Sequence, residues 1–364
     1  MAHEYSCAVV IGRFQPLHNS HVELISQALR VADKAVVLVG SSFSTRTINN
    51  PFSFEDRSFM IRVAFSDIPH NRLIIEPIRD FFYSDDVWLA NVQAACAAHI
   101  EDGESVALLG LYKDQSSYYL NMFPQWEYMR PGAKVNLDLN ATSVRNALFN
   151  VDFSTAWKDD AVGSVIKLSD ETVARQDAYF EQVLPEYTAN FLSEFRKTEI
   201  YTNLVEEYRA VQSYKEAWEK SPYPPTFVTA DAVVTCSGHV LVVRRGGNPG
   251  KGLLALPGGF VRENERVRDA ALRELKEETR IKVDKLILDS NIVDNDVFDY
   301  PGRSLRGRTI THAFHIKLKN GKLPEVKGSD DAKGAFWIPF VEVMQRAEEF
   351  FEDHVHVISR FINN

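Results

Sequence analysis

The apolar residues in the first half of the chain follow two alternating patterns. Short continuous apolar runs predict buried strands. These runs lie at residues 8–11, 35–39, 73–75 and 106–109. Between them, residues 21–32 carry apolar side chains at helical spacing, and residues 87–100 predict a further helix. Strands that alternate with helices predict an α/β fold with a parallel sheet, whose ligand site lies beyond the carboxyl ends of the strands.

The second half of the chain has a different pattern. Residues 227–235 and 239–244 predict a β-hairpin that turns at a Ser-Gly pair. After a glycine-rich loop, the sequence predicts a strongly charged helix at 267–279, strands at 286–293 and 308–318, and a last helix from residue 341 onward. This order of elements predicts an α+β fold.

The boundary between the two halves is marked by prolines. A polar, helix-prone stretch at about 169–220 ends in Pro222, Pro224 and Pro225, and proline blocks the continuation of a helix. We therefore predict a first domain at 1–196, a helical and proline-rich linker at 197–225, and a second domain at 226–364.

Composition and charge limit the classes of partner. The chain has 364 residues, 45% of them hydrophobic and 25% charged, which is ordinary for two soluble domains. Its net charge of −9 argues against nucleic acid as the main partner. The three cysteines are far apart and form no zinc spacing. No signal peptide or long apolar segment is evident, so we expect a cytoplasmic protein that has no membrane partner.

Residues 12–21, GRFQPLHNSH, carry the first candidate site. They follow a predicted strand and open a predicted helix, whose free N–H groups and partial positive charge suit a phosphate. Gly12 allows a phosphate to approach the backbone closely. His18 and His21 are three residues apart, so both imidazoles can face one point, and Arg13 can add a bidentate donor. Together these groups suit a triphosphate.

This segment resembles the phosphate motif of the nucleotidylyltransferase superfamily, and in particular its nicotinamide-mononucleotide (NMN) adenylyltransferase branch. Ser20 stands where that family usually has glycine, and its hydroxymethyl group would either crowd the nucleotide or add a hydrogen bond. The resemblance implies a Rossmann-like domain that binds ATP. The implied ATP-binding residues are Gly12, Arg13, Phe14, His18, His21, Gly110, Lys113, Thr142 and Arg145.

Two later segments support this resemblance. Residues 140–145, NATSVR, resemble the family's Ser/Thr-x-x-Arg motif, which grips the ATP phosphates at a second helix start. We expect Thr142 to cap that helix and Arg145 to reach the phosphates. Residues 109–114 end a predicted strand and would border the nucleotide, although Lys113 could equally be a solvated lysine.

The middle of the first domain resembles the same branch. The tripeptides Ser-Thr-Arg, Asn-Pro-Phe and Glu-Asp-Arg between residues 44 and 57 resemble the loop and helix beside the mononucleotide. The resemblance implies that Arg46 and Asn50 bind NMN. Trp88 could stack on the nicotinamide ring, which is a flat cation, or could pack in the core.

The implied reaction is attack of the NMN 5′-phosphate on the α-phosphate of ATP, which gives NAD and pyrophosphate. Because the nucleophile is already an anion, no general base is required. His18, His21 and Arg145 would act as catalytic residues by aligning the phosphates and neutralising their charge.

A second candidate site lies on the charged helix and the loop before it. Glu274, Glu277 and Glu278 stand at positions i, i+3 and i+4, so they line one helical face and repel one another. A hard divalent cation with oxygen ligands removes that repulsion. The carbonyl of Gly258, in the preceding Gly-Gly loop, can face the same cation.

The spacing of Gly259, Glu265, Arg273 and the three glutamates resembles the Nudix box. The resemblance implies an α+β Nudix domain that binds Mg²⁺, with Mn²⁺ as an alternative. The implied metal ligands are Gly258, Glu274, Glu277 and Glu278. Arg280 departs from the pattern, because the family has glycine there and often in a left-handed conformation, which costs more for arginine.

In the family, the metals polarise a diphosphate and activate water. The resemblance implies Glu277 as a catalytic residue and a further carboxylate from a later loop. Asp331, next to Asp330, is our candidate for that carboxylate, and a solvated loop aspartate is the alternative. We assign no chemical role to the remaining histidines of the second half, which include His312, His315, His354 and His356.

The whole chain resembles the bifunctional NMN adenylyltransferase/Nudix hydrolase proteins. The expected small-molecule partners are ATP, NMN and ADP-ribose, with ADP-ribose split into AMP and ribose 5-phosphate. Three alternatives remain open: another acceptor such as phosphopantetheine, another nucleoside diphosphate derivative as the Nudix substrate, and a Nudix domain that acts as a ligand sensor. The sequence also leaves open whether the protein is a homo-oligomer.

Overall fold

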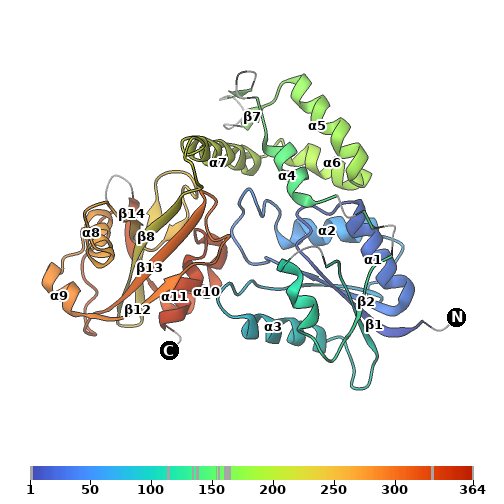
Figure 1. Ribbon diagram of the computed structural model, residues 1–364, viewed down its shortest axis with the longest axis horizontal. Helices are drawn as coiled ribbons and strands as arrows, with labels where there is room; N and C mark the ends of the chain where they lie inside the picture. The colour runs from blue at the N-terminus through green and yellow to red at the C-terminus, as the bar shows by residue number, and fades with distance from the viewer. Residues whose placement is uncertain are drawn as a thin grey trace. The chain divides into compact units, whose positions relative to one another are not determined.

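The computed structural model describes residues 3–112, 115–132, 135–136, 139–152, 154, 156–159, 165–328 and 332–362. The chain forms two compact units, Met1–Val205 and Glu206–Asn364 (Figure 1). Within the described ranges, no helix is both long enough and apolar enough to cross a bilayer.

The first unit alternates strands with helices, as its sequence pattern predicts. Its strands are β1 (Tyr5–Gly12), β2 (Ala32–Val39), β3 (Leu73–Pro77), β4 (Val106–Leu109), β5 (Glu127–Met129), β6 (Trp157–Asp159) and β7 (Val165–Lys167). Its helices are α1 (Asn19–Val31), α2 (Phe54–Ala64), α3 (Asp85–Ala97), the 3₁₀ helix η1 (Gln115–Asn121), α4 (Ala141–Phe149), α5 (Asp170–Val183) and α6 (Glu186–Phe195), and α7 (Glu199–Glu216) continues into the second unit.

The main sheet of the first unit is parallel throughout, in the order β3-β2-β1-β4-β5. The chain runs outward from β1 to β3 and then returns to the other side of β1 to form β4. The strand order therefore reverses between β1 and β4, and a crevice forms beyond the carboxyl ends of strands at such a point. The predicted α/β fold with a parallel sheet is confirmed.

Helix α1 follows β1 and covers the sheet through one apolar stripe. Leu24, Ile25, Ala28 and Leu29 are buried at the three- and four-residue spacing that the sequence shows. The helix contacts both β1 and β2. Its first turn is thereby fixed at the end of β1, where the strand order reverses.

The second unit is a mixed sheet with helices on its two faces (Figure 1). Its strands are β8 (Thr226–Cys236), β9 (His239–Arg245), β10 (Leu254–Ala255), β11 (Gly258–Phe260), β12 (Ile292–Phe298), β13 (Arg308–Lys317) and β14 (Ala332–Pro339). Its helices are α8 (Val267–Thr279), α9 (Lys285–Ser290), α10 (Phe340–Gln345), the 3₁₀ helix η3 (Ala347–Glu349) and α11 (His354–Ile362).

Strand β8 is the centre of this sheet. It pairs antiparallel with β9 and β11 and parallel with β13. The predicted hairpin is confirmed, because β8 and β9 turn at Ser237 and Gly238, which both have positive φ. Two residues with positive φ match the twist of a two-residue hairpin.

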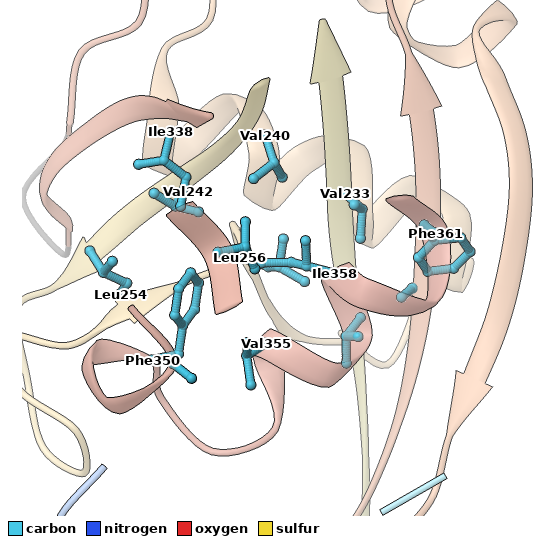
Figure 2. Packing of buried hydrophobic residues seen from close by; sticks show 14 of the residues in the cluster. Val233, Val240, Val242, Leu254, Leu256, Ile338, Phe350, Val355, Ile358 and Phe361 are labelled. Carbon is cyan, nitrogen blue, oxygen red and sulfur yellow. The ribbon is translucent and has the colours of Figure 1, made fainter. Parts of the chain in front are cut away.

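Successive residues of β8 point to opposite faces and reach two separate cores. On one face, Val233 packs with residues of β9 and the C-terminal segment (Figure 2). The labelled members of this cluster are Val233, Val240, Val242, Leu254, Leu256, Ile338, Phe350, Val355, Ile358 and Phe361. On the other face, Val234 packs with Leu272 and Leu275 of α8. The charged helix is therefore anchored by its apolar stripe.

Two predictions for the second half need correction. Residues 286–293 were expected to be one strand, but helix α9 occupies Lys285–Ser290 and β12 begins only at Ile292. The Asp284 side chain caps α9 by accepting a hydrogen bond from the Leu286 amide, and a short apolar run does not by itself distinguish strand from helix. The last helix is also interrupted, into α10 and α11.

Candidate active sites

Gly12 ends β1, and Gly110 directly follows β4, so the two glycines lie at neighbouring strand ends where the strand order reverses. A Cβ on Gly12 would lie 2.9 Å from the Phe14 ring, and a Cβ on Gly110 would overlap the Leu120 side chain. Phe14 itself has a φ of 51°. A side chain at either position would therefore displace Phe14 or Leu120 from its present place.

His18 and His21 lie together at the start of α1. Their rings stack with centroids 3.6 Å apart and planes at 18°. His18 is the N-cap residue, and its amide donates to Nδ1 of His21 over 3.4 Å. The spacing argument is confirmed to this extent: both imidazoles occupy one place at a helix N-terminus, where a phosphate is favoured.

Arg145 reaches the same region from α4. Its Nη1 donates to the Gln15 carbonyl over 2.8 Å and its Nη2 donates to the Thr142 hydroxyl over 3.0 Å. Burial lowers its pKa to about 10, and the nearby charge of Arg13 acts in the same direction. An arginine in this environment gains from an anion that supplies the missing countercharge.

The cap of α4 differs from our prediction. Asn140, not Thr142, is the N-cap residue, and its Oδ1 accepts a hydrogen bond from the Ser143 amide. Thr142 lies in the first turn, where its hydroxyl accepts from Arg145. Asparagine is among the best capping residues, so the local sequence did contain this signal.

Arg57 was missed as an organising residue of this site. Its side chain is 1% exposed, and it donates to the carbonyls of Arg13 at 2.8 Å and of Gly40 at 2.6 Å. Burial lowers its pKa to about 10. Gln15 adds a second tie, because its amide exchanges two hydrogen bonds with the backbone of Phe52. The sequence shows none of these contacts, since each joins segments far apart in the chain.

The structure places the expected NMN residues on two elements. Arg46 donates to the Pro51 carbonyl and pairs with Asp56, each at 2.8 Å, while Asn50 in the same loop has a buried Oδ1 without a hydrogen-bond partner. Trp88 on α3 is half-buried and meets Tyr119 edge to face at 5.6 Å. Part of its indole ring therefore belongs to the core.

Two further residues of the first site need comment. Ser20, in place of the family's glycine, donates a hydrogen bond to the Asn136 carbonyl over 2.9 Å. Its hydroxyl thus fixes a neighbouring loop. Lys113 lies outside the described residues.

The two glycines of the second site were expected in a loop, but they begin strand β11 and pack directly on acidic side chains. A Cβ on Gly259 would lie 2.6 Å from Oε1 of Glu274, and a Cβ on Gly258 would overlap the carboxylate of Asp231. At Gly258 a side chain would also meet the backbone of Ala230 on β8, so glycine allows this close approach. At Gly259 a side chain would displace the carboxylate of Glu274, so β11 lies close to α8.

Arg273 connects three carboxylates of α8 and of the loop that precedes it. It donates to Glu265 over 2.6 and 2.9 Å, to Glu274 over 2.6 Å and to Glu277 over 3.0 Å. Its hydrogen bonds hold the pKa of Glu265 at about 2. Glu265 and Arg273 thus form the scaffold that positions the loop against the helix.

Glu278 points inward, unlike Glu277, whose side chain is 51% exposed. The Gly258 amide donates to Glu278 over 3.1 Å, and burial raises the pKa of Glu278 to about 8. Among the described residues, no three acidic, histidine or cysteine side chains converge in a finished metal site. The donor set nonetheless suits a hard cation, because a buried carboxyl with a raised pKa is stabilised by positive charge.

The box opens into a cavity of about 460 Å³, which Gly258, Gly259 and Glu278 line together with residues that sequence reasoning missed. The missed lining residues are Asp231, Arg245, Arg303, Arg306, Glu352 and His354. Asp231 is 5% exposed, and burial raises its pKa to about 7. One signal was available: the polar residues Glu352, Asp353 and His354 stand together between Phe351 and Val355 near the C-terminus. Asp331 lies outside the described residues.

Comparisons with known proteins agree with this architecture. Residues 225–361 match the NUDIX domain family, and residues 9–91 match the Cytidylyltransferase-like family. The chain is 33% identical over 211 residues to the nicotinamide/nicotinic acid mononucleotide adenylyltransferase of Acinetobacter baylyi. This match covers 58% of this chain and 97% of that protein. It is 38% identical over 110 residues to the ADP-ribose pyrophosphatase of Methanocaldococcus jannaschii, which covers 30% of this chain and 59% of that protein.

Nearly the whole chain matches solved structures of a bifunctional enzyme. One of them is the bifunctional NMN adenylyltransferase/ADP ribose pyrophosphatase of Francisella tularensis complexed with AMP and a Mn ion. The TM-score is 0.84, the sequence identity is 35%, and the match covers 99% of both chains. Because this match spans both units and each unit also matches its own domain family, the chain belongs to the family of bifunctional NMN adenylyltransferase/ADP-ribose pyrophosphatases.

Proposed function

We propose that the first unit transfers AMP from ATP to NMN, giving NAD and pyrophosphate. The observation that carries this proposal is the stacked pair of His18 and His21 at the N-terminus of α1. Arg145 lies in the same region, because it donates to the Gln15 carbonyl three residues before His18. These three side chains would neutralise the phosphates while the NMN phosphate attacks the α-phosphate. The Gly12, Arg13 and Gly110 region would cradle the nucleotide.

The NMN subsite is assigned to the loop that carries Arg46 and Asn50. The buried Oδ1 of Asn50 lacks a partner, and it could accept a hydrogen bond from the carboxamide group of nicotinamide. Trp88, whose half-buried ring also packs on Tyr119, is the candidate for contact with the nicotinamide ring.

We propose that the second unit hydrolyses ADP-ribose to AMP and ribose 5-phosphate with a divalent cation, Mg²⁺ or Mn²⁺. The observation that carries this proposal is the hydrogen bond from the Gly258 amide of β11 to the half-buried Glu278. Glu274, Glu277, Glu278 and the Gly258 carbonyl would hold the metal, which when bound polarises the diphosphate and activates water. Arg273 would orient the first two glutamates, and both would have to turn from it toward the cation.

Two assays test these proposals together. The protein is incubated with ATP, NMN and Mg²⁺, and separately with ADP-ribose and Mg²⁺, and the products are separated by chromatography. His21→Ala and Glu278→Gln are run beside the wild type. We expect NAD from the first assay and AMP from the second, each lost only in its own variant. NAD without AMP would overturn the ADP-ribose assignment, and no NAD would overturn the acceptor assignment.

A further inference from the structure

The cavity of the second unit contains a carboxyl group that lies outside the Nudix box. Glu352 lines this cavity, its side chain is only 6% exposed, and its Oε1 is buried without a hydrogen-bond partner. Its backbone has a φ of 46°, a left-handed conformation that is unfavourable for a non-glycine residue. A strained residue with an unsatisfied buried oxygen is unfavourable for folding alone, so a role in binding is indicated.

The residues on both sides of Glu352 are firmly held. The Phe351 amide donates to the Leu254 carbonyl over 2.8 Å, and both carboxylate oxygens of Asp353 accept from Arg303 over 2.7 and 2.9 Å. His354 accepts a hydrogen bond from the Leu256 amide over 2.8 Å. Because these contacts fix the backbone, Glu352 cannot relieve its strain by a local shift, and its side chain stays in the cavity.

The surroundings of Glu352 define the ligand chemistry. Nη2 of Arg306 lies 4.0 Å from its Oε2, so a cation and a carboxylate stand side by side. Burial raises the pKa of Glu352, and Arg306 and the Ser304 hydroxyl partly offset that rise. A phosphate is attracted by Arg306 and repelled by Glu352, whereas Oε1 needs a hydrogen-bond donor. A sugar phosphate carries both an anionic group and hydroxyl donors within a few ångströms.

We propose that Glu352 recognises the substrate by accepting a hydrogen bond from a ribose hydroxyl at Oε1, while Arg306 faces the adjacent phosphate. This inference rests on the proposed hydrolysis of ADP-ribose and adds a specificity-determining residue to it. Glu352 binds the substrate rather than the reacting atoms, so its loss raises KM and leaves kcat nearly unchanged.

Steady-state kinetics on three substrates test this role. The substrates are ADP-ribose, an analogue that lacks the hydroxyls of the adenosine ribose, and an analogue that lacks those of the terminal ribose. The variants are Glu352→Gly, which suits the left-handed backbone, and Glu352→Gln, which keeps the shape and one acceptor oxygen. Glu349→Gln is the matched control, since Glu349 pairs with Arg346 at the surface. Thermal unfolding and the adenylyltransferase rate verify folding.

We expect Glu352→Gly to raise KM for ADP-ribose roughly 10- to 100-fold, the loss of one hydrogen bond to a charged group, with Glu352→Gln between it and the wild type. With the wild type, one of the two analogues should have a higher KM than ADP-ribose. With Glu352→Gly, the same analogue and ADP-ribose should have similar KM values. The hydroxyls that this analogue lacks identify the ribose that Glu352 contacts. The inference is overturned if KM for ADP-ribose is unchanged in both variants, or if each analogue raises KM by the same factor in the wild type and in both variants. Either result leaves the proposed hydrolysis of ADP-ribose intact. If the wild type hydrolyses none of the three substrates, the proposed function fails and the role of Glu352 fails with it.

Discussion

Arg145 Nη1 donates a hydrogen bond to the carbonyl oxygen of Gln15 over 2.8 Å, a contact between residues 130 positions apart. It joins α4 to the loop that leads into α1. The same guanidinium reaches the Thr142 hydroxyl through Nη2. The two helix N-termini that carry the proposed phosphate ligands are thus held together by one side chain.

Replacing Arg145 with lysine should impair the reaction with ATP. Lysine keeps the charge but has no planar fork, so it cannot serve Gln15, Thr142 and a phosphate together. We expect kcat/KM for ATP to fall roughly 100-fold, as for the loss of one preorganised donor. The matched control is Arg30→Lys, in an exposed pair with Glu23. A rate within twofold of the wild type would remove Arg145 from the catalytic set.

The stacked histidines should matter for turnover more than for stability. His18→Asn removes the imidazole and keeps a good N-cap residue, and His21→Ala removes its partner. We expect each variant to make NAD roughly 100-fold more slowly, while the midpoint of urea unfolding changes little. His99→Ala, which breaks a half-buried contact with Glu76 at 2.8 Å, is the control. A lowered urea midpoint that accompanies the loss of NAD formation would indicate a structural role for the histidines instead.

The parallel sheet and the two sites could be predicted because their signals are local. Four apolar runs mark buried strands, and the glycines, histidines and glutamates of each motif are close in sequence. The resemblance to the bifunctional family, based on those motifs, is confirmed by the match to the Francisella tularensis structure. Local patterns also predicted the β8–β9 hairpin.

The organising residues could not be predicted, because their contacts are long-range. Arg57 meets backbone carbonyls of two other loops, and Arg303 meets Asp353 across 50 residues. No spacing rule links such pairs. Helix α9 was missed for a different reason: six residues are too few for periodicity to outweigh an apolar composition that suits a strand equally.

Divalent metal should stabilise the second unit through Glu278. A ligand that binds only the folded state at 100 times its Kd adds about 2.7 kcal/mol to the free energy of unfolding. We expect Mn²⁺ to raise the unfolding midpoint of the wild type and to raise that of Glu278→Gln much less. Thermal unfolding with Mn²⁺, and again after EDTA, measures this difference, with Glu349→Gln as the control. Equal shifts in all three proteins would place the metal elsewhere.

Replacing Arg280 with glycine should stabilise the end of α8. Arg280 is the C-cap residue and has φ 45° and ψ 33°, a conformation that favours glycine. We expect the free energy of unfolding to rise by about 0.5–1 kcal/mol, because relief of strain exceeds the added flexibility of the unfolded chain. Lys282 is two residues further on, exposed, and without positive φ. Lys282→Gly should therefore lower the free energy of unfolding. Urea unfolding compares the two variants.

His354 should contribute a loss of stability of the second unit as the pH falls. This imidazole is 7% exposed, and burial lowers its pKa to about 3. In the unfolded chain a histidine has a pKa of about 6.5, so between these two values the unfolded state binds a proton that the folded state does not. The contribution of His354 to the free energy of unfolding therefore falls as the pH falls below about 6.5, whereas Asp231 and Glu278, whose pKa values are raised, contribute in the opposite direction. The loss continues until the folded state also binds the proton, near pH 3.

Between pH 7 and pH 5 this group alone should lower the free energy of unfolding by about 2 kcal/mol. His354→Asn retains an oxygen that can accept from the Leu256 amide but cannot titrate, so this part of the pH dependence should disappear. Urea unfolding at both pH values is monitored by hydrogen exchange of the β8 and β13 amides, which reports the unfolding of the second unit alone. His312→Asn is the control and should keep the wild-type difference. If His354→Asn also keeps it, another group must bind the proton on unfolding.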